Sequence, residues 1–531
     1  MTPNTKILYT DILIVGAGPT GLLLANLLGT MGISTIVVEK NSHTVREPRA
    51  VSIDDESMRS LQTIGLAEEI TKILTRGYGS IYRGPSGRVF STVKPTSKEF
   101  GFDKRNAFQQ PELEAVLLNG LNRFKKVDVI FNAELTKFSQ TNEEVISNIK
   151  TNKQKDFQIQ SKYMIGCDGG QSFTRKSLNI DISGSSFEEP WLIIDLKTTK
   201  NRSFHTEVFC NPRRSCITLP GPNGIRRYEF KLNLKEDPDS AIKEENVRTL
   251  LSSVGPDEHE EFRRVKVYTF HARLAESWRI KRVFLAGDAA HLSPPFAGQG
   301  MNSGLRDSYN LAWKLNMKLN GSTGEEILDS YELERKPHAA SMIKLAKQMG
   351  QIMMPTSQLQ GALVRGAFYV LGIYPPARDY FSQMRYKPKP RFKEGLIWPD
   401  RKTPKYSVIG QMIVQPIVET VSRERVLLDD VLPTGLALVV ISKSPDHVIS
   451  NHTLENFRQK NIPIIGITPE WINPQKSSFE IVRDVSNFFG KKPLVEYLEH
   501  TLLLRPDRYV AASQKVENTD KLLEVVKSLQ E

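Results

Sequence analysis

Residues 11–39 read DILIVGAGPTGLLLANLLGTMGISTIVVE. The apolar run Ile12–Val15 predicts a buried parallel strand, and residues 22–28 predict a helix. A second apolar, β-branched run, Ser34–Val38, ends at the acid Glu39. A strand, a glycine turn, a helix, a strand and an acid at this spacing are typical of a dinucleotide-binding βαβ unit.

The residues of the turn GAGPTG have separate roles in such a unit. Gly16 permits the tight turn, Gly18 lets the backbone approach a pyrophosphate, and Gly21 allows the helix to pack closely on the strand. Pro19 belongs to the same turn, and the helix N-terminus offers free N–H groups to the phosphates. Glu39 can accept hydrogen bonds from ribose hydroxyls. We therefore expect these residues to bind a dinucleotide, and the alternative is a glycine-rich turn without a ligand.

Composition narrows the class of protein. The 531 residues are 39% hydrophobic and 25% charged, which excludes disordered and collagen-like chains and gives a prior of about three to four domains or subdomains. The formal charge of +12 is compatible with anionic partners, but the basic residues are scattered, so we expect no nucleic-acid partner. Three cysteines without metal-ligand spacing argue against a disulfide framework and a metal site and favour a cytoplasmic location.

The stretch from Ile12 to Val38 has no charged residue and is long enough to suggest a membrane span. It contains six glycine and proline residues and Asn26, and it lacks the basic start and cleavage site of a signal peptide. We therefore expect no membrane span.

Two further motifs follow. Residues 163–170 read YMIGCDGG, and residues 282–291 read RVFLAGDAAH, an apolar run that ends in Gly-Asp. The second motif continues as LSPPFAGQGMN, residues 292–302, into a predicted long helix that stops near Gly321.

These three motifs, in this order, resemble the single-component FAD-dependent aromatic hydroxylases of the p-hydroxybenzoate-hydroxylase fold. Nearly the whole chain shares the resemblance. The other matching stretches are residues 48–56 (PRAVSIDDE), 105–111 (RNAFQQP), 267–275 (VYTFHARLA), 331–335 (YELER) and 505–510 (RPDRYV).

The resemblance implies an α/β fold with a Rossmann-like FAD-binding domain of the glutathione-reductase type over residues 1–400. A mixed-sheet substrate domain is interleaved in it, at about 78–105 and 180–275, and a thioredoxin-like domain follows over 404–531. That last domain has no cysteine, so thiol redox chemistry is excluded there. We also expect Pro337 to kink or break the helix over 325–354, and residues 375–404 to form a linker.

The resemblance also assigns site residues. It implies that FAD, the only resident cofactor expected, contacts Gly16, Gly18, Pro19, Gly21, Glu39, Arg49, Gln110, Asp168, Asp288, Gly300, Met301 and Asn302. Asp168 belongs to a motif associated with the reduced nicotinamide as well, and the helix that starts near Met301 would face the anionic reduced flavin. The segment Pro295–Ala297 departs from the family pattern near the flavin, which leaves the exact substrate in doubt.

Catalytic residues beyond the flavin stay unknown. His291 and Pro295 are candidates, with His291 favoured as a residue that packs near the flavin. Candidate substrate residues are Arg226, Tyr228, Arg273 and Phe296, because an arginine can pair with a substrate carboxylate.

The implied activity is that of a monooxygenase that uses NADH or NADPH and O2 to hydroxylate a phenolic aromatic acid through a flavin C4a-hydroperoxide. The favoured substrate is 3-(3-hydroxyphenyl)propionate, which would give the 2,3-dihydroxy product. The alternatives are another phenolic substrate, a non-oxygenating flavoenzyme of the same fold, or an FAD-binding protein that docks on membrane or nucleic acid. A homodimer is one assembly that the sequence leaves open.

Overall fold

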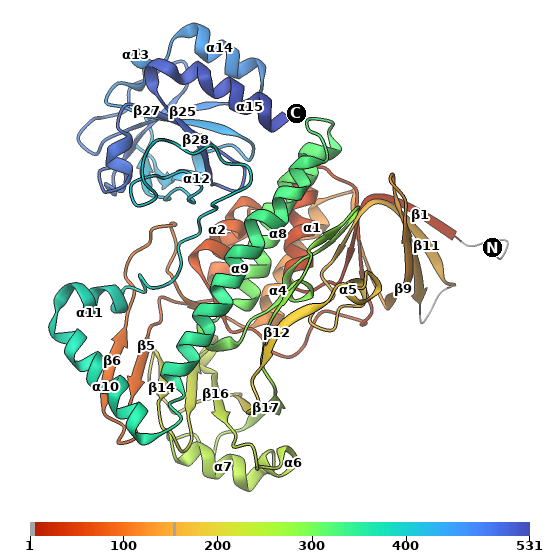
Figure 1. Cartoon of the computed structure of the whole chain (residues 1–531), viewed down its shortest axis with the longest axis vertical. Helices are drawn as coiled ribbons and strands as arrows, with labels where there is room; N and C mark the ends of the chain where they lie inside the picture. The colour runs from red at the N-terminus through yellow and green to blue at the C-terminus, as the bar shows by residue number, and fades with distance from the viewer. Residues whose placement is uncertain (1–5, 152–154, 531) are drawn as a thin grey trace. The chain divides into compact units, whose positions relative to one another are not determined.

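The strand expected before the glycine turn lies inside an eight-stranded sheet of the computed structural model, which describes residues 6–151 and 155–530. Residues 1 and 531, at which the expected domains begin and end, lie outside the described residues. Contacts divide the chain into two units. Unit 1 holds residues 1–97, 103–308 and 339–388, and unit 2 holds residues 98–102, 309–338 and 389–531. Figure 1 colours the ribbon along the chain.

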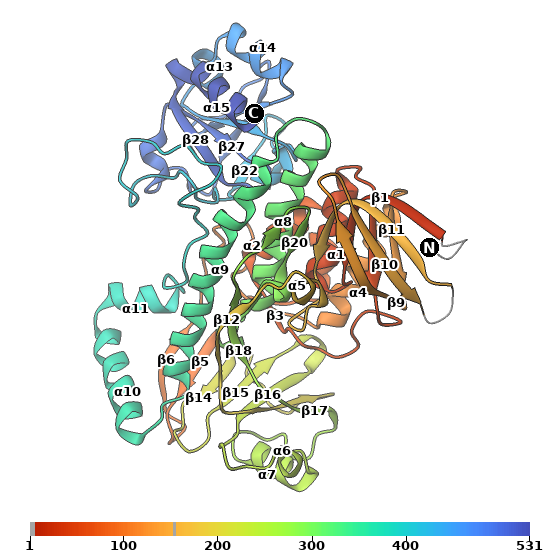
Figure 2. The ribbon, with the colours of Figure 1, turned by 45° about the vertical axis from the view of Figure 1, so that its right-hand side comes forward.

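The eight-stranded sheet of unit 1 carries the expected βαβ unit. Strand β1 pairs in parallel with β2 and β11. Strands β9 and β10 form an antiparallel hairpin, and β10 pairs with β11 (Figure 2). The strands are β19 (Arg279–Ile280), β20 (Val283–Leu285), β11 (Phe157–Gly166), β1 (Lys6–Val15), β2 (Thr35–Glu39), β8 (Val127–Phe131), β9 (Ala133–Gln140) and β10 (Val145–Thr151).

Helix α1 (Pro19–Thr30) explains the uncharged stretch near the N-terminus. Nine of its consecutive residues, from Gly21 to Gly29, are buried, so the stretch is a core helix between two core strands. Asn26 donates from Nδ2 to the carbonyl of Leu117 in α4 (Gln110–Gly120) at 2.8 Å, which satisfies its buried amide. Among the described residues, no helix is long and apolar enough to cross a membrane.

A seven-stranded mixed sheet forms the second layer of unit 1. One face packs against α7 (Glu244–Ser252), and the other face carries Ile193, Ile217 and Val208. Figures 1 and 2 show α6 (Pro238–Ala241) and α7 beyond this sheet. Its strands, in order, are β17 (Phe262–Tyr268), β13 (Trp191–Leu196), β16 (Arg226–Lys231), β15 (Cys216–Pro220), β14 (Thr206–Phe209), β5 (Ser80–Arg83) and β6 (Val89–Val93).

Small elements connect these layers. Two three-stranded sheets are formed by β12 (Ile182–Ser186), β18 (His271–Ala275) and β21 (His291–Leu292), and by β3 (Ser52–Ile53), β7 (Asn106–Ala107) and β4 (Thr75–Arg76). The short helices are α2 (Asp55–Thr63), α3 (Ala67–Lys72) and α5 (Phe173–Ser177).

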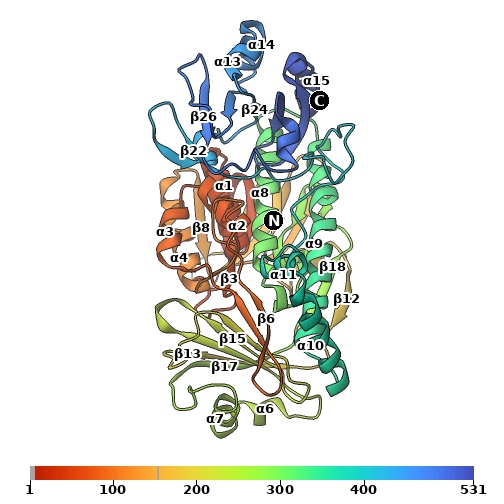
Figure 3. The same cartoon turned by 90° about the vertical axis from the view of Figure 1, so that its left-hand side faces the viewer.

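Two expectations concern helices. Helix α9 (Glu326–Met353) runs through Pro337, so of the two expected effects, a kink or a break, the break does not occur. Leu333, whose carbonyl loses its helical partner, is 50% exposed, so water can replace the missing bond. The expected linker begins with a helix, α11 (Pro375–Ser382), because a proline pair suits a first helical turn; α10 (Gln358–Ile373) precedes it (Figure 3).

Unit 2 contains its own seven-stranded mixed sheet. Two hydrophobic clusters cover its faces, one around Val439 and Leu502, the other around Val440 and Leu503. The strands, in order, are β23 (Arg425–Leu427), β22 (Ile417–Glu419), β26 (Glu480–Asp484), β25 (Ile464–Thr468), β24 (Ala437–Ile441), β27 (His500–Leu504) and β28 (Val510–Lys515). Its helices are α12 (Leu428–Val431), α13 (Pro445–Val448), α14 (Asn451–Gln459) and α15 (Leu522–Gln530). Helix α8 (Gly300–Leu319) and α9 belong partly to each unit.

Candidate functional site

A cavity of about 1060 Å³ lies within unit 1. Its wall combines the carboxyl ends of β1 and β2, the Gly-Asp turns and one face of the seven-stranded sheet. Ligands of open α/β sheets bind beyond the carboxyl ends of the strands, so this is where the sequence motifs place a dinucleotide. Thirteen of the sequence-predicted residues line the cavity: Gly16, Gly18, Pro19, Glu39, Arg49, Gln110, Asp168, Arg273, Asp288, Pro295, Phe296, Gly300 and Met301.

The glycine turn leaves room for a ligand at one position only. Gly16 has a φ of 109°, and a Cβ there would lie 2.4 Å from the carbonyl oxygen of Cys167. A Cβ on Gly21 would lie 2.1 Å from the carbonyl oxygen of Gly16, so Gly21 serves packing and does not line the cavity. A Cβ on Gly18 would meet no protein atom within 4 Å. Gly18 therefore keeps open space at the N-terminus of α1.

Glu39 ends β2 beside this turn. Its Oε2 accepts a hydrogen bond from the backbone N–H of Ala17 at 3.0 Å, and its Oε1 accepts one from the N–H of Asn41 at 2.9 Å. Each carboxylate oxygen can accept more than one donor, so Glu39 fixes the turn and still offers acceptor capacity to ribose hydroxyls.

Arg49 and Gln110 come together at the edge of the cavity. Gln110 accepts from the N–H of Ala50 at 2.8 Å and donates to Glu114 Oε1 at 2.8 Å. Burial raises the pKa of Glu114 to about 7. Gln110 thus holds the loop that carries Arg49.

Asp168 is held by its own motif. Its carboxylate accepts hydrogen bonds from Ser172 Oγ and from the N–H and hydroxyl of Thr174, the last two at 2.9 and 3.0 Å. Burial raises the pKa of the neighbouring Cys167 thiol, so this cysteine is not a reactive thiolate.

The Gly-Asp motif separates two candidate residues. Asp288 lines the cavity, and desolvation by the surrounding protein raises the pKa of its carboxyl group. His291 does not line the cavity: it is buried, with Nε2 2.7 Å from Asp307 Oδ2 and its ring beside Trp278. Asp307 also accepts the N–H of Gly287 at 3.1 Å. His291 thus stabilises the motif and does not reach the cavity as a base would have to.

The loop before α8 is tied by Asn302. Its Nδ2 donates to the carbonyls of Ser52 and Gly298, at 3.0 and 2.7 Å, and its Oδ1 accepts from Ser57 Oγ at 2.7 Å. Asn302 is fully buried and does not line the cavity, whereas Gly300 and Met301 do. The N-terminus of a 20-residue helix, with its partial positive charge, therefore faces the cavity.

The apolar part of the cavity contains Phe296. Its ring packs against those of Phe187, Trp191 and Phe270, with centroids 5.5, 5.4 and 6.1 Å away. Arg273 lines the cavity from β18 and donates to Ser186 Oγ at 2.8 Å.

Two predicted substrate residues lie elsewhere. Tyr228 is buried in the cluster against α7 and donates to Asp257 at 2.7 Å, and Arg226 points to Thr218 and to the carbonyl of Ser203. Neither lines the cavity, because successive side chains of β16 point to opposite faces; Arg227 and Glu229 line it instead.

Sequence reasoning missed an ion network on that face. Asp195 accepts from Arg227 Nε at 2.6 Å and from Arg264 Nε at 2.9 Å. Arg227 also donates to the carbonyl of Arg49 at 2.9 Å, and Arg264 to that of Pro48 at 2.9 Å. Alternation along β16 was the only sequence signal for this network, which anchors the Arg49 loop.

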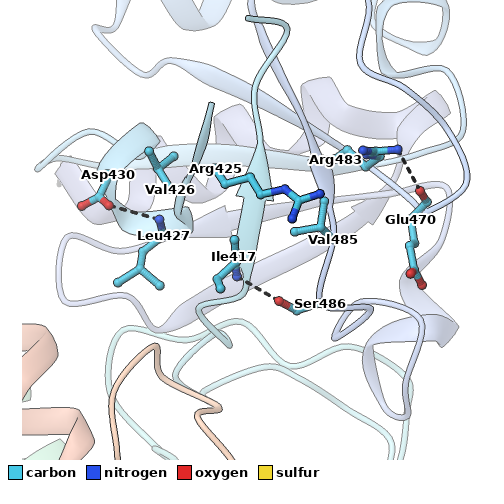
Figure 4. A pocket seen from close by; sticks show the side chains of 9 residues that line it. All are labelled: Ile417, Arg425, Val426, Leu427, Asp430, Glu470, Arg483, Val485 and Ser486. Atoms are coloured by element: carbon cyan, nitrogen blue, oxygen red, sulfur yellow. Dashed lines mark hydrogen bonds between the residues drawn. The ribbon is translucent and has the colours of Figure 1, made fainter. Parts of the chain in front are cut away.

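A second hollow, of about 750 Å³, lies in unit 2 (Figure 4). Arg425 and Arg483 line it, and each pairs with Glu419, at 3.4 and 2.6 Å. Asp430 accepts the N–H of Leu427 at 3.1 Å. Both arginines of this hollow are therefore already paired with an acid.

FAD fits the residues of the unit 1 cavity. The space that a Cβ on Gly18 would fill adjoins free N–H groups at the start of α1, which suits a pyrophosphate. Glu39 stands where a ribose is expected, and the start of α8 suits an electron-rich ring. The cavity is large enough for a dinucleotide with an aromatic substrate beside it, and the sequence motifs line its wall.

Comparisons with known proteins agree with this geometry. Residues 9–346 match the family described as FAD binding domain, and residues 410–529 match the HcaD C-terminal domain. A 3-(3-hydroxy-phenyl)propionate/3-hydroxycinnamic acid hydroxylase of Klebsiella pneumoniae is 39% identical over 506 residues, covering 94% of this chain and 91% of the relative. The enzyme of the same name from Escherichia coli is 36% identical, covering 98% and 94%.

Solved structures share the fold. The flavin-dependent monooxygenase PieE in complex with FAD and substrate superposes with a TM-score of 0.82 at 19% identity, over 98% of this chain and 99% of that one. Aklavinone-11 hydroxylase with FAD and aklavinone gives 0.77 at 21% identity, over the same shares. The mixed α/β class and the FAD cofactor expected from the sequence are confirmed. This chain belongs to the family of FAD-dependent hydroxylases that includes the 3-(3-hydroxyphenyl)propionate/3-hydroxycinnamic acid hydroxylases.

Proposed function

We propose that this protein hydroxylates the ring of a phenolic aromatic acid, with 3-(3-hydroxyphenyl)propionate as substrate and its 2,3-dihydroxy derivative as product. NADH or NADPH and O2 are the co-substrates. The observation that carries the proposal is one continuous cavity in which the dinucleotide motifs adjoin an apolar chamber lined by Phe296, Phe270 and Met353. Relatives named for this acid, 36–39% identical along nearly the whole chain, support the choice of substrate.

FAD, when bound, supplies the electron transfer and the oxygen chemistry. The chain's own residues position and shield the reactants. Ile193, Val208 and Ile217 from the sheet and Met349 and Met353 from α9 line the chamber with apolar side chains, which exclude water from the ring. The start of α8, at Gly300 and Met301, faces the same space and stabilises negative charge there.

We propose the following division into domains. Residues 1–400 form a Rossmann-like FAD-binding domain of the glutathione-reductase type, with a substrate domain interleaved at about 78–105 and 180–275. The separate seven-stranded sheet that contains β5 and β13 supports the interleaved domain. Residues 404–531 form a thioredoxin-like domain, supported by a mixed sheet with helices α14 and α15 packed on one cluster.

We also propose a cytoplasmic homodimer. All three cysteines are free, which suits a reducing compartment. Helix α10 and the residue after it expose Leu359, Leu363, Tyr369 and Tyr374 by 64–73%, and a second copy of the chain would cover such an apolar face. Light scattering of the purified protein tests the assembly.

Oxygen uptake tests the activity. The FAD-loaded protein is given NADH or NADPH, with and without 3-(3-hydroxyphenyl)propionate. Uptake that depends on the acid supports the proposal, and indifference to every phenolic acid rejects it in favour of another flavoenzyme of the same fold.

A further inference from the structure

Arg105 is a cation of the cavity wall whose partners are all uncharged. It donates to Ser80 Oγ and, at 3.2 Å, to the hydroxyl of Tyr78, and its guanidinium lies 4.5 Å from the Tyr78 ring centre. No carboxylate among the described residues forms an ion pair with it. A partly buried guanidinium without a counter-ion attracts an anion, since desolvation weakens its hydration.

Three other cations of the cavity wall already pair with acids. Arg227 and Arg264 share Asp195, and Lys387 pairs with Asp54 and Glu56 at 2.9 and 2.6 Å.

Two more arginines of the wall are set aside for different reasons. Arg175 donates to the carbonyls of Ala289 and Gly170, and Arg273 donates to Ser186 in an exposed hydrogen bond. Arg105 differs from both because its partner Ser80 lies on β5, in the sheet whose face lines the apolar chamber.

The groups around Arg105 are neutral. Burial raises the pKa of Tyr82 and that of Tyr386, so both line the cavity as protonated phenols. Nearby His205 accepts the N–H of Gly79 on Nδ1 at 3.0 Å, and desolvation lowers its pKa, which keeps it uncharged. Within residues 6–151 and 155–530, no charged side chain therefore pairs with Arg105.

An independent observation comes from the adjacent strand. Thr206 pairs with Ser80 across β14 and β5, lines the cavity and is 3% exposed. Its Oγ1 is buried and has no hydrogen-bond partner among the described residues. A buried hydroxyl without a partner is costly unless a ligand supplies one. Arg105, Ser80 and Thr206 thus converge on one place.

The distance along the sheet suits an aromatic acid. Val208 lies on the same strand as Thr206, and Ile217 and Leu219 lie on the next strand, β15, which is two strand spacings of about 4.8 Å each from Ser80 on β5. If the carboxylate of an aromatic acid binds at Arg105, the short side chain and the ring of that acid would lie along this apolar face.

We infer that Arg105, with Ser80 and Thr206, forms the subsite that binds the carboxylate of the aromatic acid. The inference deepens the proposed function and rests on it for the identity of the acid. Arg105 is a binding residue here, since it recognises the side chain of the substrate and leaves the ring to the flavin.

The test compares an acid with its neutral analogue. Binding of 3-(3-hydroxyphenyl)propionate and of 3-(3-hydroxyphenyl)propionamide to the FAD-loaded protein is measured from the change in flavin absorbance, and product is assayed separately. Removal of a charge-assisted contact lowers affinity by about 10- to 150-fold, so R105Q should weaken the acid by that factor and the amide by less than about threefold. R105K should restore part of the acid affinity.

Matched variants guard against misfolding. R273Q removes another arginine of the same cavity and should leave the acid-to-amide ratio within about threefold of wild type. T206V keeps the shape of Thr206 and should weaken the acid several-fold without loss of thermal stability. FAD content and melting temperature are recorded for each variant.

The outcomes separate the two proposals. Selective loss of the acid in R105Q supports the subsite even if no hydroxylated product forms, in which case only the proposed function fails. Equal loss of acid and amide, an unchanged ratio, or a wild type that binds the amide as well as the acid overturns the subsite, whatever the turnover.

Discussion

Replacing Gly18 by alanine separates cofactor binding from folding. The added methyl meets no protein atom within 4 Å, and the backbone at φ −81° and ψ −178° is open to any residue. Alanine at an N-cap costs about 0.5 kcal/mol relative to glycine, and the loss of freedom in the unfolded chain offsets about 0.4–1 kcal/mol. The apoprotein of G18A should therefore unfold within about 0.5 kcal/mol of wild type.

The effect on FAD should be large, because the methyl occupies the space where the pyrophosphate meets the start of α1. Loss of two charge-assisted hydrogen bonds costs about 3 kcal/mol or more, which is at least about 100-fold in Kd. Quenching of FAD fluorescence measures the affinity, and urea unfolding of the apoprotein measures stability. G21A is the matched control: its methyl would lie 2.1 Å from the Gly16 carbonyl oxygen, so it should destabilise the fold itself. An unchanged FAD affinity in G18A would refute the placement of the cofactor.

Four further predictions follow from single side chains. D195N leaves Arg227 and Arg264 without their shared acid and should lower the free energy of unfolding by about 3 kcal/mol, with weaker FAD binding, as urea unfolding and fluorescence quenching will show. Glu334 is buried between Arg505 and Lys314, at 2.6 and 2.7 Å, and these cations lower its pKa to about 2. The ionised Glu334 should therefore stabilise the fold fully above about pH 4.5, and this contribution to the free energy of unfolding should be lost as the pH falls from about 4.5 to 2. Unfolding curves of E334Q should lack this pH dependence. Burial raises the pKa of Glu114 to about 7, so the contribution of this residue to the free energy of unfolding should decline as the pH rises from about 4.5 to 7. Unfolding curves of E114Q should lack this pH dependence. Y228F removes a buried bond to Asp257 and should cost about 1 kcal/mol of stability while KM for the acid stays unchanged; a raised KM would contradict the placement of Tyr228 away from the cavity.

Local motifs predicted the dinucleotide half of the molecule well. The expected strand at Ile12–Val15 lies within β1, the expected strand at Ser34–Val38 differs from β2 by one residue at each end, and the Gly-Asp turn at Asp288 follows β20. Such short-range signals suffice because the turn, the helix start and the acid are all within one continuous segment.

The substrate half depended on contacts that a sequence does not reveal. Alternation along β16 separates Arg226 from Arg227, but both faces of the strand are buried, one by α7 and one by the cavity wall, so the pattern could not say which face holds the substrate. That no described carboxylate pairs with Arg105 follows from the three-dimensional packing of β5, β14 and their neighbours. His291 is a candidate base from its place beside the Gly-Asp motif. Its structural role is visible only from its pairing with Asp307, 16 residues further along the chain.

The central claim is that this chain inserts an oxygen atom of O2 into a phenolic acid. Its most direct test is incubation of the FAD-loaded protein with 3-(3-hydroxyphenyl)propionate, NADH or NADPH and ¹⁸O2, followed by mass spectrometry of the product. The account predicts a 2,3-dihydroxy acid that carries one labelled oxygen. An unlabelled product, or nicotinamide oxidation that yields only peroxide with this and other phenolic acids, would contradict it.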